Sequence, residues 1–438
     1  MADLESGFRA LKEARGPETW IPEVWDEAER RTARRPTSPV RWAGLAAAIL
    51  ALAVAAAGLL LAIEVFGGRA PEPARPANAI THFPEGWTQL STPPEDLGDG
   101  AAFVWTGSEV LAWGGCQGEA PPGCGQSLRG YAFDPDARTW RPLPLIDAPS
   151  SSNAVWTGRE AIFFQNEPPP GSSVETTLVG HAYDPAAGTW RTLPEAPIPA
   201  RTGAVYLWTG REAIVWGGGH GRGAAEGAAY DPDTDSWRRI ADAPLGLNLA
   251  DAVWTGREMI VFGSLLDDRN VADTRTSVGA AYDPASDTWR TLPPADLSPQ
   301  ATAAAWAAGR MVAYDYETRW QAYDPTTDEW TTPANMPFPF SECYPSAATA
   351  GDHAFAYFCG RGALYDPATN DWERLHGGPL DDQVEGQGGL PLWWSAVLVP
   401  AEDGLFLSLQ GITVVGQDDT PCYGCPGSPR SFWVYRPG

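Results

Sequence analysis

Two observations in the sequence predict an all-β fold, a β-propeller of seven blades. The first is a tyrosine, six further residues and a tryptophan, which recur at Tyr183–Trp190, Tyr230–Trp237, Tyr282–Trp289, Tyr323–Trp330 and Tyr365–Trp372, with Phe133–Trp140 as a copy that begins with phenylalanine. The six tryptophans follow one another at intervals of 50, 47, 52, 41 and 42 residues, and such a period with aromatic markers is typical of propeller blades. The second is composition: 47 Gly, 42 Pro, 21 Trp and a single lysine, Lys12, favour short strands joined by turns.

Each repeat is expected to form four strands. The segment AVWTGREAIFF, from Ala154, predicts a hairpin with its turn at Thr-Gly. The third strand ends at the repeated tyrosine, and Asp-Pro then makes a turn because proline fixes φ and aspartate caps through its side chain. The fourth strand, Trp-Arg-x-Leu-Pro, is ended by its proline.

The blade count and the closure of the ring follow from the ends of the chain. First-strand markers lie near Trp105, Trp156, Trp208, Trp254, Trp306, Ala348 and Ala396, which gives seven blades. The seventh blade reaches the C-terminus before its fourth strand, whereas GWTQL, from Gly86, matches the missing pattern. We therefore expect Trp87 to Leu90 to complete the last blade and leave the ring without an exposed edge.

The order of an apolar strand, a glycine pair, a tyrosine, six residues and a tryptophan resembles the Kelch repeat of the galactose-oxidase and Kelch β-propeller superfamily. The resemblance covers residues 85–438 and implies a Kelch-type propeller; with the N-terminal segment discussed next, we expect a bacterial, membrane-anchored member. The glycine pair stands at Gly114–Gly115 and Gly217–Gly218 but is replaced in other repeats, for example by Gln165-Asn166. That departure weakens the match to the well-known Kelch families.

The N-terminal part predicts a membrane anchor. We expect a helical cytoplasmic tail over residues 1–41, a transmembrane helix over 42–64, a Pro/Ala-rich linker over 65–84 and the propeller over 85–438. The 42–63 stretch carries no charge and spans roughly 33 Å as a helix. Arginines crowd its N-terminal side, which puts the N-terminus in the cytoplasm and the propeller outside the cell membrane. A cleaved signal peptide is the alternative; the long polar stretch before the apolar run favours the anchor.

The net charge of −25 arises entirely beyond the tail, because residues 1–41 carry eight acidic and eight basic side chains. An acidic domain repels phosphate backbones, so nucleic acid is excluded as the expected partner.

All six cysteines fall in the part expected outside the cell, where disulfides form. Their spacing favours the local pairs Cys116 with Cys124, Cys343 with Cys359, and Cys422 with Cys425. Other connectivities remain open, and the CYGC segment that ends at Cys425 could instead form a redox or metal site.

Candidate ligand-binding residues lie in the loops that vary between repeats. The Thr-Gly and Asp-Pro turns are short and uniform and belong to one face, so the variable loops belong to the other, where binding is usual on a rigid scaffold. These loops are 115–129, 165–178, 217–227, 263–278, 374–392 and 411–430. The polar candidates are Arg201, His220, Arg222, Glu226, Asp251, Asp267, Asp268, Arg269, Asp418 and Asp419, with Asn153, Asp381 and Asp382 beside them. Arg201 resembles an arginine at the mouth of Kelch propellers.

The residues favour a recognition domain for a surface protein, a glycan or a small ligand, with no cofactor and no metal. The alternative is a carbohydrate-active enzyme on the same scaffold: a sugar mutarotase, a glycosidase or, least favoured, a copper oxidase. A copper site of the superfamily type needs a Tyr–Cys crosslink, for which local cysteine pairing leaves no thiol. No GxSxG, HExxH or P-loop motif occurs.

Overall fold

The computed structural model divides the chain into two compact units, Met1–Ala74 and Arg75–Gly438. It describes residues 80–94, 97–98, 100–119, 125–146, 153–164, 177–201, 203–219, 223–264, 277–297, 303–315, 319–332, 346–358, 361–377, 394–411, 413–414, 421–423 and 430–438. The predicted tail and transmembrane helix lie outside these residues, as does the linker up to residue 79. Within the described ranges there is no helix, and hence none that is long and apolar enough to cross a membrane.

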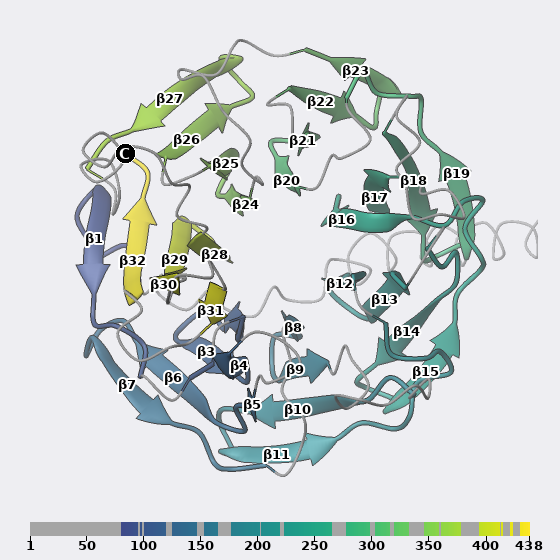
Figure 1. Ribbon diagram of the computed structural model, residues 1–438. Helices are drawn as coiled ribbons and strands as arrows, with labels where there is room; N and C mark the ends of the chain where they lie inside the picture. The colour runs from purple at the N-terminus through teal and green to yellow at the C-terminus, as the bar shows by residue number, and fades with distance from the viewer. Residues whose placement is uncertain are drawn as a thin grey trace, which may run out of the picture. The chain divides into compact units, whose positions relative to one another are not determined.

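Seven four-stranded antiparallel sheets stand around one axis and form a seven-bladed β-propeller (Figure 1). The predicted blade count is confirmed. The innermost strands are β2 (Ala102–Trp105), β8 (Asn153–Trp156), β12 (Ala204–Trp208), β16 (Asn248–Trp254), β20 (Ala303–Ala307), β24 (Ser346–Ala350) and β28 (Trp394–Ala401). All seven predicted first-strand markers lie in these strands, and consecutive inner strands contact one another around the ring.

The outer three layers repeat in the same order. The second strands are β3 (Val110–Trp113), β9 (Ala161–Phe164), β13 (Ala213–Gly217), β17 (Met259–Ser264), β21 (Arg310–Tyr314), β25 (His353–Phe358) and β29 (Gly404–Gly411). The third strands are β6 (Gly130–Asp134), β10 (Gly180–Asp184), β14 (Gly227–Asp231), β18 (Val278–Asp283), β22 (Trp320–Asp324), β26 (Arg361–Asp366) and β32 (Arg430–Arg436). The outermost strands are β7 (Thr139–Pro142), β11 (Thr189–Thr192), β15 (Ser236–Arg239), β19 (Thr288–Thr291), β23 (Glu329–Thr331), β27 (Asp371–Leu375) and β1 (Gly86–Leu90).

The Tyr-x6-Trp motif forms the hairpin between the third and fourth strands. In blade 3, Tyr230 of β14 is the cross-strand partner of Trp237 of β15, and their ring centroids lie 5.2 Å apart. The Trp237 indole Nε1 donates to the Pro194 carbonyl of the preceding blade at 2.9 Å. The motif therefore both builds a blade and joins it to its neighbour, as predicted from the aromatic period.

The sixth residue of each motif copy occupies the left-handed region. In the five copies other than the blade 2 copy, where glycine takes this place, the residue is Arg138, Asp235, Asp287, Asp328 or Asn370, with φ between 49° and 58°. Asp and Asn tolerate this conformation better than other non-glycine residues. The Asp235 carboxylate also accepts a hydrogen bond from the Tyr230 hydroxyl at 2.6 Å. An aspartate at this position thus both adopts the left-handed backbone conformation and accepts the hydrogen bond of the repeat's tyrosine.

The ring closes as the sequence predicts. Strand β1 pairs with β32 from Gly86 opposite Arg436 to Leu90 opposite Phe432, which supplies the outermost strand of blade 7 (Figure 1). Ile80 and Phe83, just before β1, are each 1% exposed in the apolar cluster between blades 7 and 1. Full burial of such side chains is worth about 1.5–3 kcal/mol each. The first and last described segments therefore stabilise the interface between blades 7 and 1; we call each interface between neighbouring blades a seam.

Side chains of the inner strands alternate between the two neighbouring seams. In β12, Val205 and Leu207 pack toward blade 4, whereas Tyr206 and Trp208 pack toward blade 2. Since each blade buries both faces against its neighbours, the apolar core is distributed around the ring in seam clusters.

A small extra sheet links the loops of blades 1 and 7. It consists of β30 (Thr413–Val414), β31 (Pro421–Tyr423), β4 (Cys116–Glu119) and β5 (Gly125–Gln126), in that order. Strands β31 and β4 pair with Cys422 opposite Glu119. Two of the loops predicted to be long and variable are thus joined through backbone pairing.

Candidate functional site

The two kinds of repeat turn lie on one face of the propeller, as predicted. Arg159 of the Thr-Gly turn in blade 2 contacts Asp184 of the Asp-Pro turn in the same blade, with Nε and Oδ2 3.5 Å apart. Blades 3 and 4 repeat the contact. We call this the turn face; the opposite face, which carries the loops between second and third strands and between blades, is the variable face.

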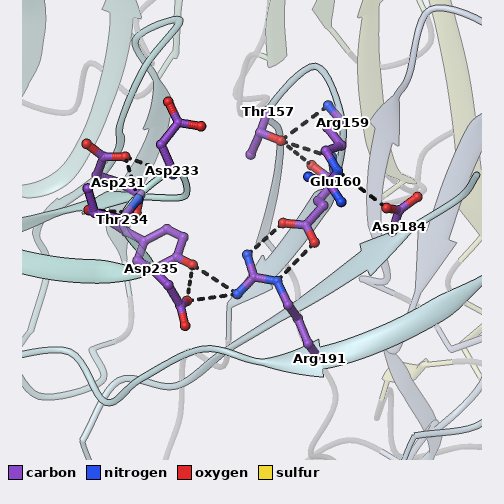
Figure 2. A network of polar contacts seen from close by, with 10 residues as sticks. Thr157, Arg159, Glu160, Asp184, Arg191, Asp231, Asp233, Thr234 and Asp235 are labelled. Carbon is purple, nitrogen blue, oxygen red and sulfur yellow. Dashed lines mark hydrogen bonds and ion pairs between the residues drawn. The ribbon is translucent and has the colours of Figure 1, made fainter. Parts of the chain in front are cut away.

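The turn face is held by a charged network that repeats from blade to blade (Figure 2). Arg191 of β11 donates from Nη2 to Glu160 at 2.6 Å and from Nε at 2.9 Å, within blade 2. Its Nη1 donates to the Tyr230 hydroxyl at 3.0 Å and to Asp235 at 2.9 Å, both in blade 3. A single guanidinium therefore joins two blades, and we call this arrangement the latch.

The same latch recurs at the next two seams. The equivalent groups are Arg238 with Glu212, Tyr282 and Asp287, and Arg290 with Glu258, Tyr323 and Asp328. Burial and the hydrogen bond to Asp235 together raise the pKa of Tyr230 to about 12, although Arg191 acts to lower it. The phenol therefore stays protonated and donates to the aspartate. Sequence reasoning missed the latch, although its glutamate and arginine recur in TGRE and Trp-Arg.

On the variable face, two of the predicted residues lie together. Arg201, just before β12, and Glu226, just before β14, form an ion pair through Nη2 and Oε1, with side chains 11% and 32% exposed. The Arg239 Nη1 donates to the other carboxylate oxygen of Glu226 at 2.8 Å. Burial raises the pKa of Glu226, but the hydrogen bond from Arg239 and the charge of Arg201 outweigh it, so the pKa lies below its usual value. Glu226 is therefore ionised and fixes Arg201.

Among the residues that the structure describes, two buried donors at this pair find no hydrogen-bond partner: Arg201 Nη1 and the Tyr206 hydroxyl. The Tyr206 ring stacks on Phe164 of blade 2 with centroids 5.0 Å apart. Burial raises the Tyr206 pKa well above its usual value, opposed only in part by the charge of Arg201, so its hydroxyl keeps its proton. An unpaired buried donor costs about 1–3 kcal/mol, and native structures keep few of them.

Tyr206 was not among the predicted residues, yet the sequence carries a signal for it. It stands in β12, two residues before the tryptophan of its inner strand. The same position in three other blades is alanine, at Ala154, Ala252 and Ala304. Blade 1 carries Phe103 at this position, so the feature peculiar to Tyr206 is its hydroxyl group.

Asp251 lies apart from this pair, on β16 at the seam between blades 4 and 5. Its two carboxylate oxygens accept from the backbone N–H groups of Ala252 and Ala304, each at 2.8 Å. Burial raises the Asp251 pKa to about 6, although both hydrogen bonds act to lower it. Its carboxylate oxygens are engaged in joining two blades.

The remaining predicted candidates, His220, Arg222, Asp267, Asp268, Arg269, Asp418 and Asp419, lie outside the described residues. Of the cysteines, Cys116 and Cys422 are placed as strand residues, and the other four lie outside the described part of the chain. The predicted pairings therefore remain predictions. The described residues hold no group of three or more His, Cys, Asp or Glu side chains that could bind a metal ion.

Comparison with known proteins gives no family. No protein-family model matches the chain, and no curated protein matches it. The solved structure of YjhT aligns with 67% of this chain and 99% of its own length, at 12% sequence identity and a TM-score of 0.45. The propeller assignment rests on the sheets and registers described above.

Proposed function

We propose that the chain is a membrane-anchored recognition protein whose Kelch-type propeller, outside the cell membrane, binds its ligand at the variable face through Arg201 and Tyr206. The observation that carries the proposal is the pair of buried donors at these two residues, for which the described part of the chain offers no hydrogen-bond partner. Both offer an N–H or O–H, so the ligand group they fit is an acceptor: a carboxylate, carbonyl or hydroxyl oxygen of a surface glycan or protein.

The surroundings hold both donor groups in place. Glu226 holds the Arg201 guanidinium through one nitrogen, and no described residue accepts from the other, while Phe164 fixes the Tyr206 ring. Donors held in place lose little freedom on binding, which favours affinity. Binding at such a site requires no catalytic residue.

Glycan-array binding and a turnover screen, both on the full chain in detergent, test this function. We expect binding by the wild-type protein, loss of at least tenfold in affinity for Arg201→Gln and Tyr206→Phe, and no consumption of the bound glycan. The matched control is Arg159→Gln, which removes an exposed arginine from the opposite face. Consumption of the glycan would replace the proposal with the carbohydrate-active enzyme; equal loss in the control would refute the site.

The membrane topology has its own test, because Lys12 is the single lysine of the chain. If residues 1–41 lie in the cytoplasm, an amine-reactive reagent that cannot cross membranes leaves Lys12 unlabelled on intact cells and labels it after permeabilisation. The Arg75→Lys variant adds a lysine to the segment expected outside and should be labelled on intact cells. Labelling of Lys12 on intact cells would reverse the topology.

A further inference from the structure

The ion pair of Arg201 and Glu226 holds more positive than negative charge. Both carboxylate oxygens of Glu226 are engaged, because Oε1 accepts from Arg201 Nη2 and Oε2 accepts from Arg239 Nη1 at 2.8 Å. Within the described part of the chain, neither arginine forms an ion pair with a second carboxylate. Two guanidinium groups against one carboxylate leave a local charge of +1.

The latches on the turn face have the opposite balance. Arg191 lies between Glu160 and Asp235, so that one guanidinium group serves two carboxylates (Figure 2). The chain as a whole carries 55 acidic and 30 basic side chains. The positive excess beside Arg201 therefore runs against the composition of the protein and is a feature of this place on the variable face.

Burial makes the missing negative charge significant. The Arg201 side chain is 11% exposed, and the described residues offer no acceptor to its buried Nη1. A buried charge is costly unless it is paired and hydrogen-bonded, and hydrogen bonds between charged groups are the strong ones. The group that would complete the surroundings of Arg201 is therefore an anion rather than a neutral acceptor.

Tyr206 adds a second donor but no charge. Burial raises its pKa well above the usual value, and the nearby charge of Arg201 opposes this only in part, so the phenol stays neutral. It cannot balance Arg201, although its buried hydroxyl can donate to a ligand. A carboxylate has two acceptor oxygens and one negative charge, which matches two donors and a local charge of +1.

We propose that the site at Arg201 and Tyr206 is specific for a carboxylate. One oxygen accepts from Arg201 Nη1, the other accepts from the Tyr206 hydroxyl, and the negative charge balances the second guanidinium group, that of Arg239. The inference rests on the proposed function and narrows its ligand from any acceptor oxygen to an acid. Uronic acids and glutamate side chains share this chemistry, and the probes below distinguish the two sources.

Isothermal titration of the full chain in detergent compares two acids with their own amides. The probes are methyl β-glucuronide with methyl β-glucuronamide, and acetyl-glutamate-amide with acetyl-glutamine-amide. Each amide keeps the shape of its acid but loses the charge and sets N–H groups against the two donors. We expect at least one acid to bind at least tenfold more tightly than its amide, with affinity falling as salt is raised. The acid that binds identifies the source.

Variants of Arg239 test the charge balance, because they leave both donors in place. Arg239→Gln removes one positive charge and should lower the affinity for the acid at least threefold, while the affinity for the amide stays the same. Arg239→Lys keeps the charge and should retain the affinity for the acid. Arg159→Gln, which removes an arginine from the turn face, is the matched control and should also retain it. Urea unfolding midpoints of all variants are measured alongside.

The proposal is overturned if neither acid binds, if the amides bind as tightly as the acids, or if Arg239→Lys or Arg159→Gln loses as much affinity as Arg239→Gln. Each of these results leaves the proposed function standing as long as glycan-array binding still falls in Arg201→Gln. Glycan-array binding that does not depend on Arg201 would instead refute the site itself.

Discussion

Replacing Arg191 with glutamine removes one latch between blades 2 and 3 and leaves the backbone untouched. The substitution strips the Glu160 carboxylate, 12% exposed, of both its guanidinium hydrogen bonds, at 2.6 and 2.9 Å. Hydrogen bonds to a charged group contribute about 1.5–3 kcal/mol, and a nearly buried carboxylate left without its partner costs more than its own bond. The second contact, to Asp235, is 59% exposed on the aspartate side and adds about 0.2–1 kcal/mol.

We therefore expect Arg191→Gln to lower the free energy of unfolding by about 2–4 kcal/mol, since Arg191 is itself 34% exposed and solvent moderates the loss. The assay is urea unfolding of the full chain followed by tryptophan fluorescence. Arg159→Gln, whose side chain is 82% exposed with one contact of 3.5 Å, should cost less than about 0.5 kcal/mol.

A double-mutant cycle isolates the pair itself. Glu160→Gln combined with Arg191→Gln should recover part of the loss, because no unpaired charge then stays buried, with a coupling energy of about 1–2 kcal/mol. Equal effects of Arg191→Gln and Arg159→Gln, or a coupling energy near zero, would refute the latch as a stabilising device.

Three further predictions concern single positions in the seams. Burial raises the Asp251 pKa to about 6, so the folded state favours the protonated acid, and the free energy of unfolding should rise by roughly 2 kcal/mol as pH falls from 7.5 toward 4.5. Asp251→Asn should abolish that rise in a pH series of urea unfolding, and an unchanged pH dependence would contradict the prediction. Burial lowers the pKa of His181, so its contribution has the opposite sign, and the free energy of unfolding should fall as pH drops below about 6.5. His181→Phe should remove this loss in the same pH series. An identical loss in the variant would assign the effect to other groups. A Cβ at Gly227 would lie 2.8 Å from the Val215 carbonyl oxygen and 2.9 Å from Trp216 Cδ1, so Gly227→Ala should lower the free energy of unfolding by more than about 1 kcal/mol. An unchanged free energy of unfolding would show that β13 and β14 can move apart to accept the methyl group.

The fold was predictable because its information is local and repeated. The Tyr230–Trp237 copy specifies a strand, a turn and a strand over eight residues, and its equivalents do the same in the other blades. The closure by Trp87 was predictable for the same reason, since a missing fourth strand in blade 7 matched a surplus one before blade 1. Repetition makes each local signal count several times.

The site was predictable only in part, because its contacts cross between strand ends. Arg201 and Glu226 were singled out from their place near variable loops, but their pairing depends on β12 and β14 both beginning on the same face. Tyr206 was missed because its phenol becomes significant only once burial leaves it without a partner. The latch was missed because Arg191 joins groups from two blades that no single repeat contains.

The unfolding free energy of Tyr206→Phe tests most directly whether the donors on the variable face are kept for a ligand. If the Tyr206 hydroxyl has no partner in the free protein, its removal takes away an uncompensated buried group and leaves the ring on Phe164. The account predicts that stability stays equal or rises by about 1 kcal/mol while glycan-array binding falls. A loss of stability of about 1 kcal/mol or more, with binding intact, would show that the hydroxyl serves the fold and would contradict the proposed site.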